Sequence, residues 1–149
     1  MTKFVLACSV MFLVTVLGSA FAANEMDEAK GLVEKAAGFY KANGKEKLLA
    51  EANNPKGQFV KGDVYVFLYD TKITVIAHPF NPALVGKNML EVPDADGKYF
   101  RKDVAEQMKT KPAFWVDYKY KNPKSGKVEQ KTTYVKKVDD ILICAGAYK

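Results

Sequence analysis

Phe114-Trp-Val-Asp-Tyr-Lys-Tyr120 is the first of three successive runs rich in β-branched and aromatic residues at the C-terminal end of the chain. Val128 to Val138 and Ile141 to Tyr148 are the other two. Such runs are typical of β-strands. Asn122-Pro-Lys-Ser-Gly126 and Asp139-Asp140, which separate them, have the composition of turns. The stretch therefore predicts an antiparallel meander of three strands.

Two more strands are predicted upstream. Val64 to Tyr69 and Ile73 to Ala77 have the same character, and Asp70-Thr-Lys72 between them indicates a hairpin. From His78 to Gly97 the chain shows no clear period. A stretch of this length without secondary structure inside a compact domain is usually either functional or wrongly assigned.

Helices are expected on both sides of these strands. Asn24 is placed to cap a helix whose apolar stripe runs from Met26 to Tyr40 with helical spacing, and Asn43-Gly44 supplies its stop. Shorter helical patterns cover Lys45 to Ala52 and Lys98 to Met108. The order of elements predicts an α+β fold, with helices covering an antiparallel sheet of five strands.

The first 22 residues have the pattern of a secretory signal peptide. Lys3 supplies the positive charge, Phe4 to Leu17 the apolar run, and Ala20-Phe-Ala22 the cleavage site. The apolar run is shorter than the roughly 20 residues that span a bilayer. We therefore expect residues 23–149 to form one mature domain, periplasmic or secreted and without a membrane span.

The basic residues do not form a nucleic-acid-binding surface in the sequence. The formal net charge is +6, but the lysines are scattered among acids, and Arg101 is the single arginine. Nucleic-acid recognition needs basic residues clustered on one face. No nucleic-acid partner is predicted.

Catalysis has little support in the sequence. His78 is the single histidine, Ser125 is the single serine after the predicted leader, and Cys144 lies in an apolar run typical of a buried core thiol. A zinc site could be completed only by carboxylates. Asp94-Ala-Asp96-Gly97 resembles the start of a calcium loop, but the closing glutamate is absent, so we interpret it as a turn capping the helix at Lys98. We predict that the protein is not an enzyme and has no metal or cofactor.

Several short motifs occur along the chain in a fixed order: His78-Pro79, Gly86-Lys87, Asp94 to Gly97, Trp115 to Tyr118, Lys131 and Gly146-Ala-Tyr148. In this order they resemble the single Cache domain, an extracellular small-molecule sensing module of bacterial receptors. The resemblance covers about residues 25 to 149. It implies a PAS-like sheet behind a long N-terminal helix, with a role in signal transduction or chemotaxis.

The resemblance also implies a set of ligand-binding residues. The matching His-Pro opens the pocket, the Trp115–Tyr118 strand lines it, and Lys131 points inward. Composition alone would leave Lys131 in water, whereas a buried ammonium needs an anion, for which a ligand carboxylate is the natural partner. Two further candidates come from the residues themselves: Tyr134, three positions after Lys131, and Arg101, whose guanidinium suits bidentate carboxylate binding. A small organic acid is therefore the expected ligand, and a membrane receptor a further partner.

The alternation of side chains along a strand limits this set. Trp115 and Tyr118 fall on opposite faces of a regular strand, so both reach one ligand only if the strand has a bulge. The same holds for Lys131 and Tyr134. For His78 two roles stay open, contact with the ligand or anchoring of the loop. In the first role its protonation would tighten anion binding as the pH falls from about 7.5 to 5.5.

Two departures from the family pattern stiffen the expected pocket rim. Thr71-Lys72-Ile73 stands where a hairpin glycine is usual, and Lys111-Pro-Ala-Phe114 replaces a glycine-rich turn. The alternative to a ligand-binding module is a structural or regulatory protein of the cell envelope that binds no small ligand and contacts another protein through its helix face.

Overall fold

The structure is a computed structural model that describes residues 17–149 of the chain, with side chains from residue 23 onward. Its elements, in chain order, are α1 (Leu17–Asn43), α2 (Lys45–Ala52), β1 (Val60–Lys61), β2 (Val64–Asp70), β3 (Val75–Ala77), the 3₁₀ turn η1 (Pro82–Leu84), α3 (Phe100–Gln107), β4 (Ala113–Lys121), β5 (Val128–Val138) and β6 (Ile141–Tyr148). This is the predicted α+β fold.

All strand pairs in the sheet are antiparallel, in the order β1-β2-β6-β5-β4, and β3 pairs with β2. The five predicted strands are all present, and β4, β5 and β6 form the predicted meander. The two-residue strand β1 is an addition, too short to show a strand pattern in sequence.

The hairpin between β2 and β3 contains an unusual residue. Ile73 has φ 65°, a conformation that favours glycine, and its side chain is fully buried. The strand β3 therefore begins at Val75, later than the predicted Ile73. A β-branched residue thus adopts the left-handed conformation at the turn where glycine was expected, and its buried side chain offsets part of the backbone strain.

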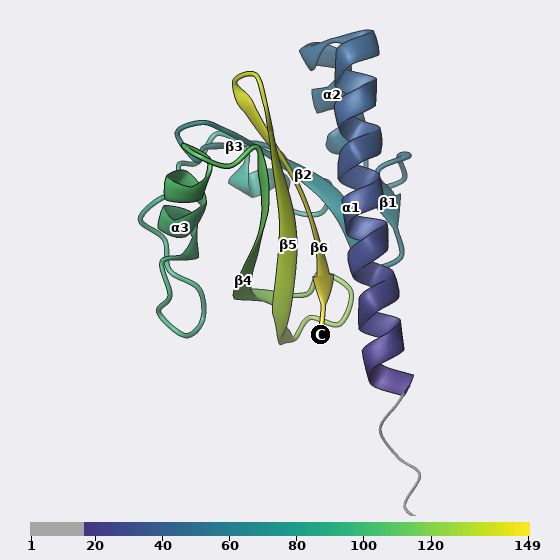
Figure 1. Cartoon of the computed structure of the whole chain (residues 1–149), viewed down its shortest axis with the longest axis vertical. Helices are drawn as coiled ribbons and strands as arrows, with labels where there is room; N and C mark the ends of the chain where they lie inside the picture. The colour runs from purple at the N-terminus through teal and green to yellow at the C-terminus, as the bar shows by residue number, and fades with distance from the viewer. Residues whose placement is uncertain (1–16) are drawn as a thin grey trace, which may run out of the picture.

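Helices and loop cover the sheet on both faces. In Figure 1, α1 crosses one face, whereas α3 and the segment that leads into it lie on the other side. Two hydrophobic clusters result, one between the sheet and α1 with α2, the other between the sheet and α3 with the loop. Residues 64–69 of β2 are consequently all buried. Burial on both faces explains why this strand shows no polar alternation.

The predicted N-terminal helix is present but begins earlier than expected. Asn24 lies inside α1, which starts at Leu17, so it is not the helix cap of the full chain. The reason is that the alanine-rich residues before Asn24 continue the helix. The predicted stripe is confirmed, since Ala29, Val33 and Ala36 are fully buried.

Residues 1–16, which hold most of the predicted signal peptide, lie outside the described residues. No helix in the described part of the chain is long and apolar enough to cross a membrane.

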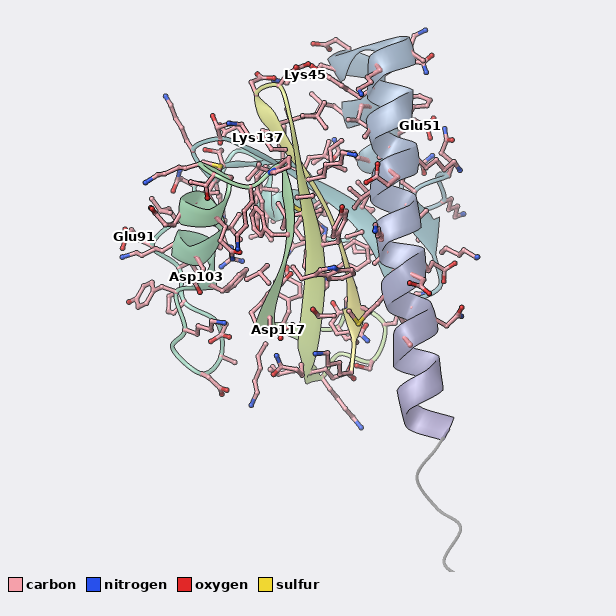
Figure 2. The ribbon with its side chains drawn as sticks, in the orientation of Figure 1. Lys45, Glu51, Glu91, Asp103, Asp117 and Lys137 are labelled. Atoms are coloured by element: carbon pink, nitrogen blue, oxygen red, sulfur yellow. The ribbon has the colours of Figure 1, made fainter. Side chains whose placement is uncertain are left out.

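The β5–β6 hairpin is tied to the helical layer by two polar contacts. The Lys45 ammonium lies 2.7 Å from the Asp140 carboxylate, and the Tyr40 hydroxyl donates to Asp139 at 2.9 Å. Figure 2 shows Lys45 and Lys137 near this hairpin end of the molecule. These contacts fix the strand pair that carries Lys131.

The Asp94–Gly97 turn is present, but it does not cap α3 as predicted. The Asp94 carboxylate accepts the backbone N–H groups of Asp96, Lys98 and Lys119 at 2.8–2.9 Å. The helix starts at Phe100, and Tyr99 before it makes no side-chain cap. Because Lys119 belongs to β4, the turn fastens the long loop to the edge of the sheet instead.

Candidate functional site

Three directly opposed residues form the centre of the candidate site. On the loop-facing side of the sheet, Lys131 of β5 is paired in register with Tyr118 of β4 and with Tyr148 of β6. Tyr65, Phe67 and Tyr69, at alternate positions of β2, belong to the same cluster. The regular two-residue period of the strands thus gathers aromatic rings around one lysine.

The Lys131 side chain is buried, with 1% of its surface exposed. Its ammonium donates to the hydroxyls of Tyr65 at 3.1 Å and Tyr148 at 3.4 Å. It also lies 4.3 Å from the Tyr65 ring centre and 4.7 Å from that of Tyr148. Burial lowers the pKa of Lys131 to about 7. The prediction that this lysine points inward agrees with its position.

Arg101 is a second buried cation at the same pocket, with 4% of its surface exposed. Its guanidinium donates to the Tyr69 hydroxyl at 3.1 Å and to the Val92 carbonyl at 3.0 Å, and it lies 4.3 Å from the Phe100 ring centre. Among the side chains of residues 23–149, no carboxylate lies within salt-bridge distance of Arg101 or Lys131.

His78 lines the pocket and also holds the long loop in place. Its Nδ1 atom accepts the backbone N–H groups of Phe80 at 3.2 Å and Asn81 at 3.0 Å, and the backbone N–H of His78 donates to the Asn53 side-chain oxygen at 3.0 Å. The ring proton therefore sits on Nε2. Burial first, and the nearby Lys131 charge second, lower the pKa of His78 to about 4. The expected protonation between pH 7.5 and 5.5 does not occur at this value, because the imidazole stays neutral throughout.

Trp115 and Tyr134 are placed on the opposite face of the sheet. They are paired in register, with ring centres 5.1 Å apart, and both pack against the cluster under α1. The pairing of β4 with β5 is continuous from Ala113 to Lys121, without the bulge that would turn Trp115 toward Tyr118. Neither residue lines the pocket, so the structure does not bring them together with Lys131.

A small enclosed pocket connects the buried groups. Its volume open to the centre of a water molecule is about 10 Å³, room for one water. The lining residues are Tyr65, Phe67, Tyr69, Val75, His78, Leu84, Arg101, Tyr118, Tyr120 and Lys131. Four predicted site residues therefore meet here: His78, Arg101, Tyr118 and Lys131. The described residues contain no group of three or more His, Cys, Asp or Glu side chains placed to hold a metal ion.

Of the tyrosines that line this pocket, Tyr118 was predicted, whereas Tyr65, Tyr69 and Tyr120 were missed by sequence reasoning. Tyr65 and Tyr69 looked like ordinary core residues of an apolar strand, and Tyr120 like a core aromatic of a half-buried strand. The signal that could have found them is alternation: positions 65, 67 and 69 share a face, and so do positions 118 and 120.

Three solved structures share this fold. One is a periplasmic sensor domain of a chemotaxis protein, with TM-score 0.69 and 19% identity, covering 90% of this chain and 99% of that one. Another is a Cache chemosensory domain described as recognising carboxylic acids, with TM-score 0.65 and 23% identity over 88% of this chain and 92% of that one. The third is a methyl-accepting chemotaxis protein from Vibrio parahaemolyticus, with TM-score 0.69 and 19% identity. The match covers 87% of this chain and 92% of that one.

The family comparison covers nearly the whole described chain. The model for Single Cache domain 2 matches residues 22–148, from the second turn of α1 to the last residue of β6. That range includes the strands and the loop that build the pocket. The chain belongs to the single Cache domain 2 family.

Proposed function

We propose that the protein is a periplasmic or secreted sensory module that binds a small carboxylate in the pocket around Lys131. The observation that carries the proposal is a fully enclosed ammonium that has hydroxyl and aromatic partners but no described carboxylate within reach. Taking a cation out of water costs several kcal/mol unless an opposite charge compensates it. An anionic ligand supplies that charge.

The neighbouring groups suit a carboxylate. The hydroxyls of Tyr65 and Tyr148 lie beside the Lys131 ammonium, and hydroxyls can donate to a carboxylate oxygen. Arg101 adds a second positive charge to the pocket wall. The related Cache chemosensory domain described as recognising carboxylic acids supports the same ligand class.

A second function is favoured by one observation. The pocket has room for about one water molecule, and aromatic rings already surround the Lys131 ammonium. A protein that binds no small ligand and acts through contact with another envelope protein is compatible with this packing. Cation–π contacts of about 2 kcal/mol each offset part of the burial cost.

A thermal-shift screen decides between the two functions. At 100 times its Kd a ligand adds about 2.7 kcal/mol of stability, which raises the Tm on the order of 10 °C for a domain of this size. We expect small monocarboxylates or dicarboxylates to produce such a rise, whereas chloride and inorganic phosphate serve as anion controls.

Two variants locate the effect. Lys131→Met removes the buried ammonium, and Lys137→Met removes an exposed lysine from the same strand (Figure 2). The proposal requires the acid-induced rise to vanish in the first and to persist in the second. Equal rises in all three proteins would overturn the proposed site, and the absence of a rise with any acid would favour the second function.

A further inference from the structure

Two larger cavities lie outside the enclosed pocket around Lys131, which we call the inner pocket. The first outer cavity has a volume of about 290 Å³, and its apolar wall includes Met89, Val92 and Phe100. The second has a volume of about 160 Å³ and lies beside Asn122 and Pro123. Ligand pockets for small molecules commonly begin near 300 Å³, so the inner pocket alone is too small for an organic acid.

Few side chains separate these spaces. Leu84, Arg101 and Tyr120 line both the inner pocket and the larger outer cavity. His78 and Tyr120 line both the inner pocket and the smaller one. Tyr120 is thus the residue common to all three spaces.

The polar wall residues differ in how firmly they are held. Three hydrogen bonds fix His78, and Arg101 makes two hydrogen bonds and stacks on Phe100. Tyr120 is half-buried near the end of β4, with its ring centre 5.3 Å from the Lys131 ammonium and its hydroxyl beside the Asn81 side chain of the loop. A side chain with part of its surface in water changes rotamer more readily than one enclosed on all sides.

We propose that Tyr120 is the specificity-determining residue of this site: its ring closes the inner pocket toward both outer cavities and sets the size of ligand that reaches Lys131. The inference rests on the proposed carboxylate function for its ligand, but the barrier itself is a property of the unliganded protein. When Tyr120 is displaced, an anionic group reaches Lys131 while the remainder of the ligand lies among Leu84, Met89 and Phe100.

The barrier can be measured without any ligand, through the reactivity of Lys131. Acetic anhydride at pH 8 acetylates neutral lysine amines, and the Lys131 pKa of about 7 makes this amine neutral there. Enclosure is then what protects it. Peptide mass spectrometry gives its acetylation rate, with the exposed Lys56 of the same molecule as internal reference.

Three variants make the test specific. Tyr120→Ala removes the ring, Tyr120→Phe keeps it, and Val128→Ala shortens an exposed side chain that lines only the larger outer cavity of the three. We expect Tyr120→Ala to accelerate Lys131 acetylation by about tenfold or more relative to Lys56, and the other two to stay within about twofold of wild type. Circular dichroism verifies that each variant is folded. An unchanged rate in folded Tyr120→Ala overturns the proposal.

A second measurement connects the barrier to ligand size. Thermal shifts are measured with straight-chain monocarboxylates from acetate to octanoate, and the cut-off is the longest acid that still raises the Tm. We expect a longer cut-off in Tyr120→Ala than in wild type, and the wild-type cut-off in Tyr120→Phe. Identical cut-offs in Tyr120→Ala and wild type contradict the role in specificity. If acetylation accelerates and no acid shifts the Tm of any protein, the barrier stands and the carboxylate function fails, so the two ideas are separable.

Discussion

The side chain of Lys131 passes directly over the backbone of Gly146. A Cβ atom at position 146 would lie 2.6 Å from Lys131 Cε and 2.3 Å from the Thr133 hydroxyl oxygen, closer than real Cβ contacts. Gly146 is in register with Thr133 on the neighbouring strand. The missing side chain of the glycine therefore provides the space through which Lys131 reaches the tyrosines.

Gly146→Ala should displace the lysine from its place between the tyrosines. We expect a loss of stability of about 1–3 kcal/mol from overpacking, together with loss of the acid-induced Tm rise. Ala145→Gly, on the opposite face of the same strand, is the control, because it can destabilise the fold without touching Lys131. Retention of full ligand binding in Gly146→Ala would show that the lysine position is not what binding requires.

Ligand affinity should depend on pH through Lys131. Its pKa of about 7 in the free protein means that binding an anion above pH 7 requires uptake of a proton. Affinity should be roughly constant from about pH 6 to 7 and fall toward tenfold per pH unit between pH 8 and 9. Isothermal titration in two buffers of different ionisation enthalpy measures the proton uptake.

The other titratable groups around Lys131 do not produce this profile. Burial raises the pKa of the tyrosine hydroxyls and of the Cys144 thiol, and burial together with the Lys131 charge lowers that of His78 to about 4. None of these groups changes charge between pH 7 and 9. Zero proton uptake at pH 8.5 by a protein that does bind the acid would contradict an ammonium–carboxylate contact.

Stability without ligand should also report the buried lysine. The unfolded chain binds a proton at this residue up to a pKa of about 10.4, whereas the folded chain releases it near pH 7. The Lys131 contribution to the free energy of unfolding therefore rises with pH between 7 and 10, by at most about 1.4 kcal/mol per pH unit. Lys131→Met lacks this rise and should be more stable than wild type at pH 7. Urea unfolding of both proteins at pH 7 and 9 measures the difference between their free energies of unfolding. If this difference does not shrink between pH 7 and 9, Lys131 stays charged in the folded protein.

His78 should stabilise the long loop and should not contribute a charge to ligand binding. His78→Gln removes the ring nitrogen that accepts the backbone N–H groups of Phe80 and Asn81. The free energy of unfolding should fall by about 1–3 kcal/mol. Because the folded pKa of about 4 is below the unfolded value of 6.5, wild type should lose stability as the pH falls from about 6.5 to 4, and the variant should lose less. Ligand affinity between pH 5.5 and 7.5 should run parallel in both proteins. A change of ligand affinity near pH 6.5 in wild type alone would instead show that a charged His78 contacts the ligand.

Trp115 should be dispensable for binding. Trp115→Phe alters packing under α1 on the far side of the sheet and should lower the Tm while leaving the Kd within about twofold. Tyr118→Phe is the informative comparison, because its hydroxyl lies 2.9 Å from the Thr133 hydroxyl inside the cluster around the pocket. A large loss of affinity in Trp115→Phe would require a ligand site other than the inner pocket.

Periodicity and turn residues were sufficient to predict the order of the elements other than β1 and η1, and β5 and β6 occur at the predicted residues. The backbone of Ile73 could not be predicted, because no propensity favours φ 65° for a β-branched residue. For the site, alternation alone separated Tyr118 from Trp115 and Lys131 from Tyr134. The family resemblance turned Lys131 inward but kept residues of both faces in the predicted set, and only the structure separates the two faces. The encirclement of Lys131 by Tyr65 and Tyr148 depends on β2 and β6 being neighbours, a long-range pairing that local sequence does not encode.

The most direct test of the central claim is the pKa of Lys131 itself, measured by NMR from the pH dependence of its side-chain ¹³Cε and ¹⁵Nζ shifts, with the signal assigned by its loss in Lys131→Met. In the free protein we predict a value of about 7. Saturation with a carboxylate that raises the Tm should move it upward by about two pH units or more, because the bound anion stabilises the ammonium. The same pKa in the free and the saturated protein would contradict the account, since the bound acid would then not contact this lysine.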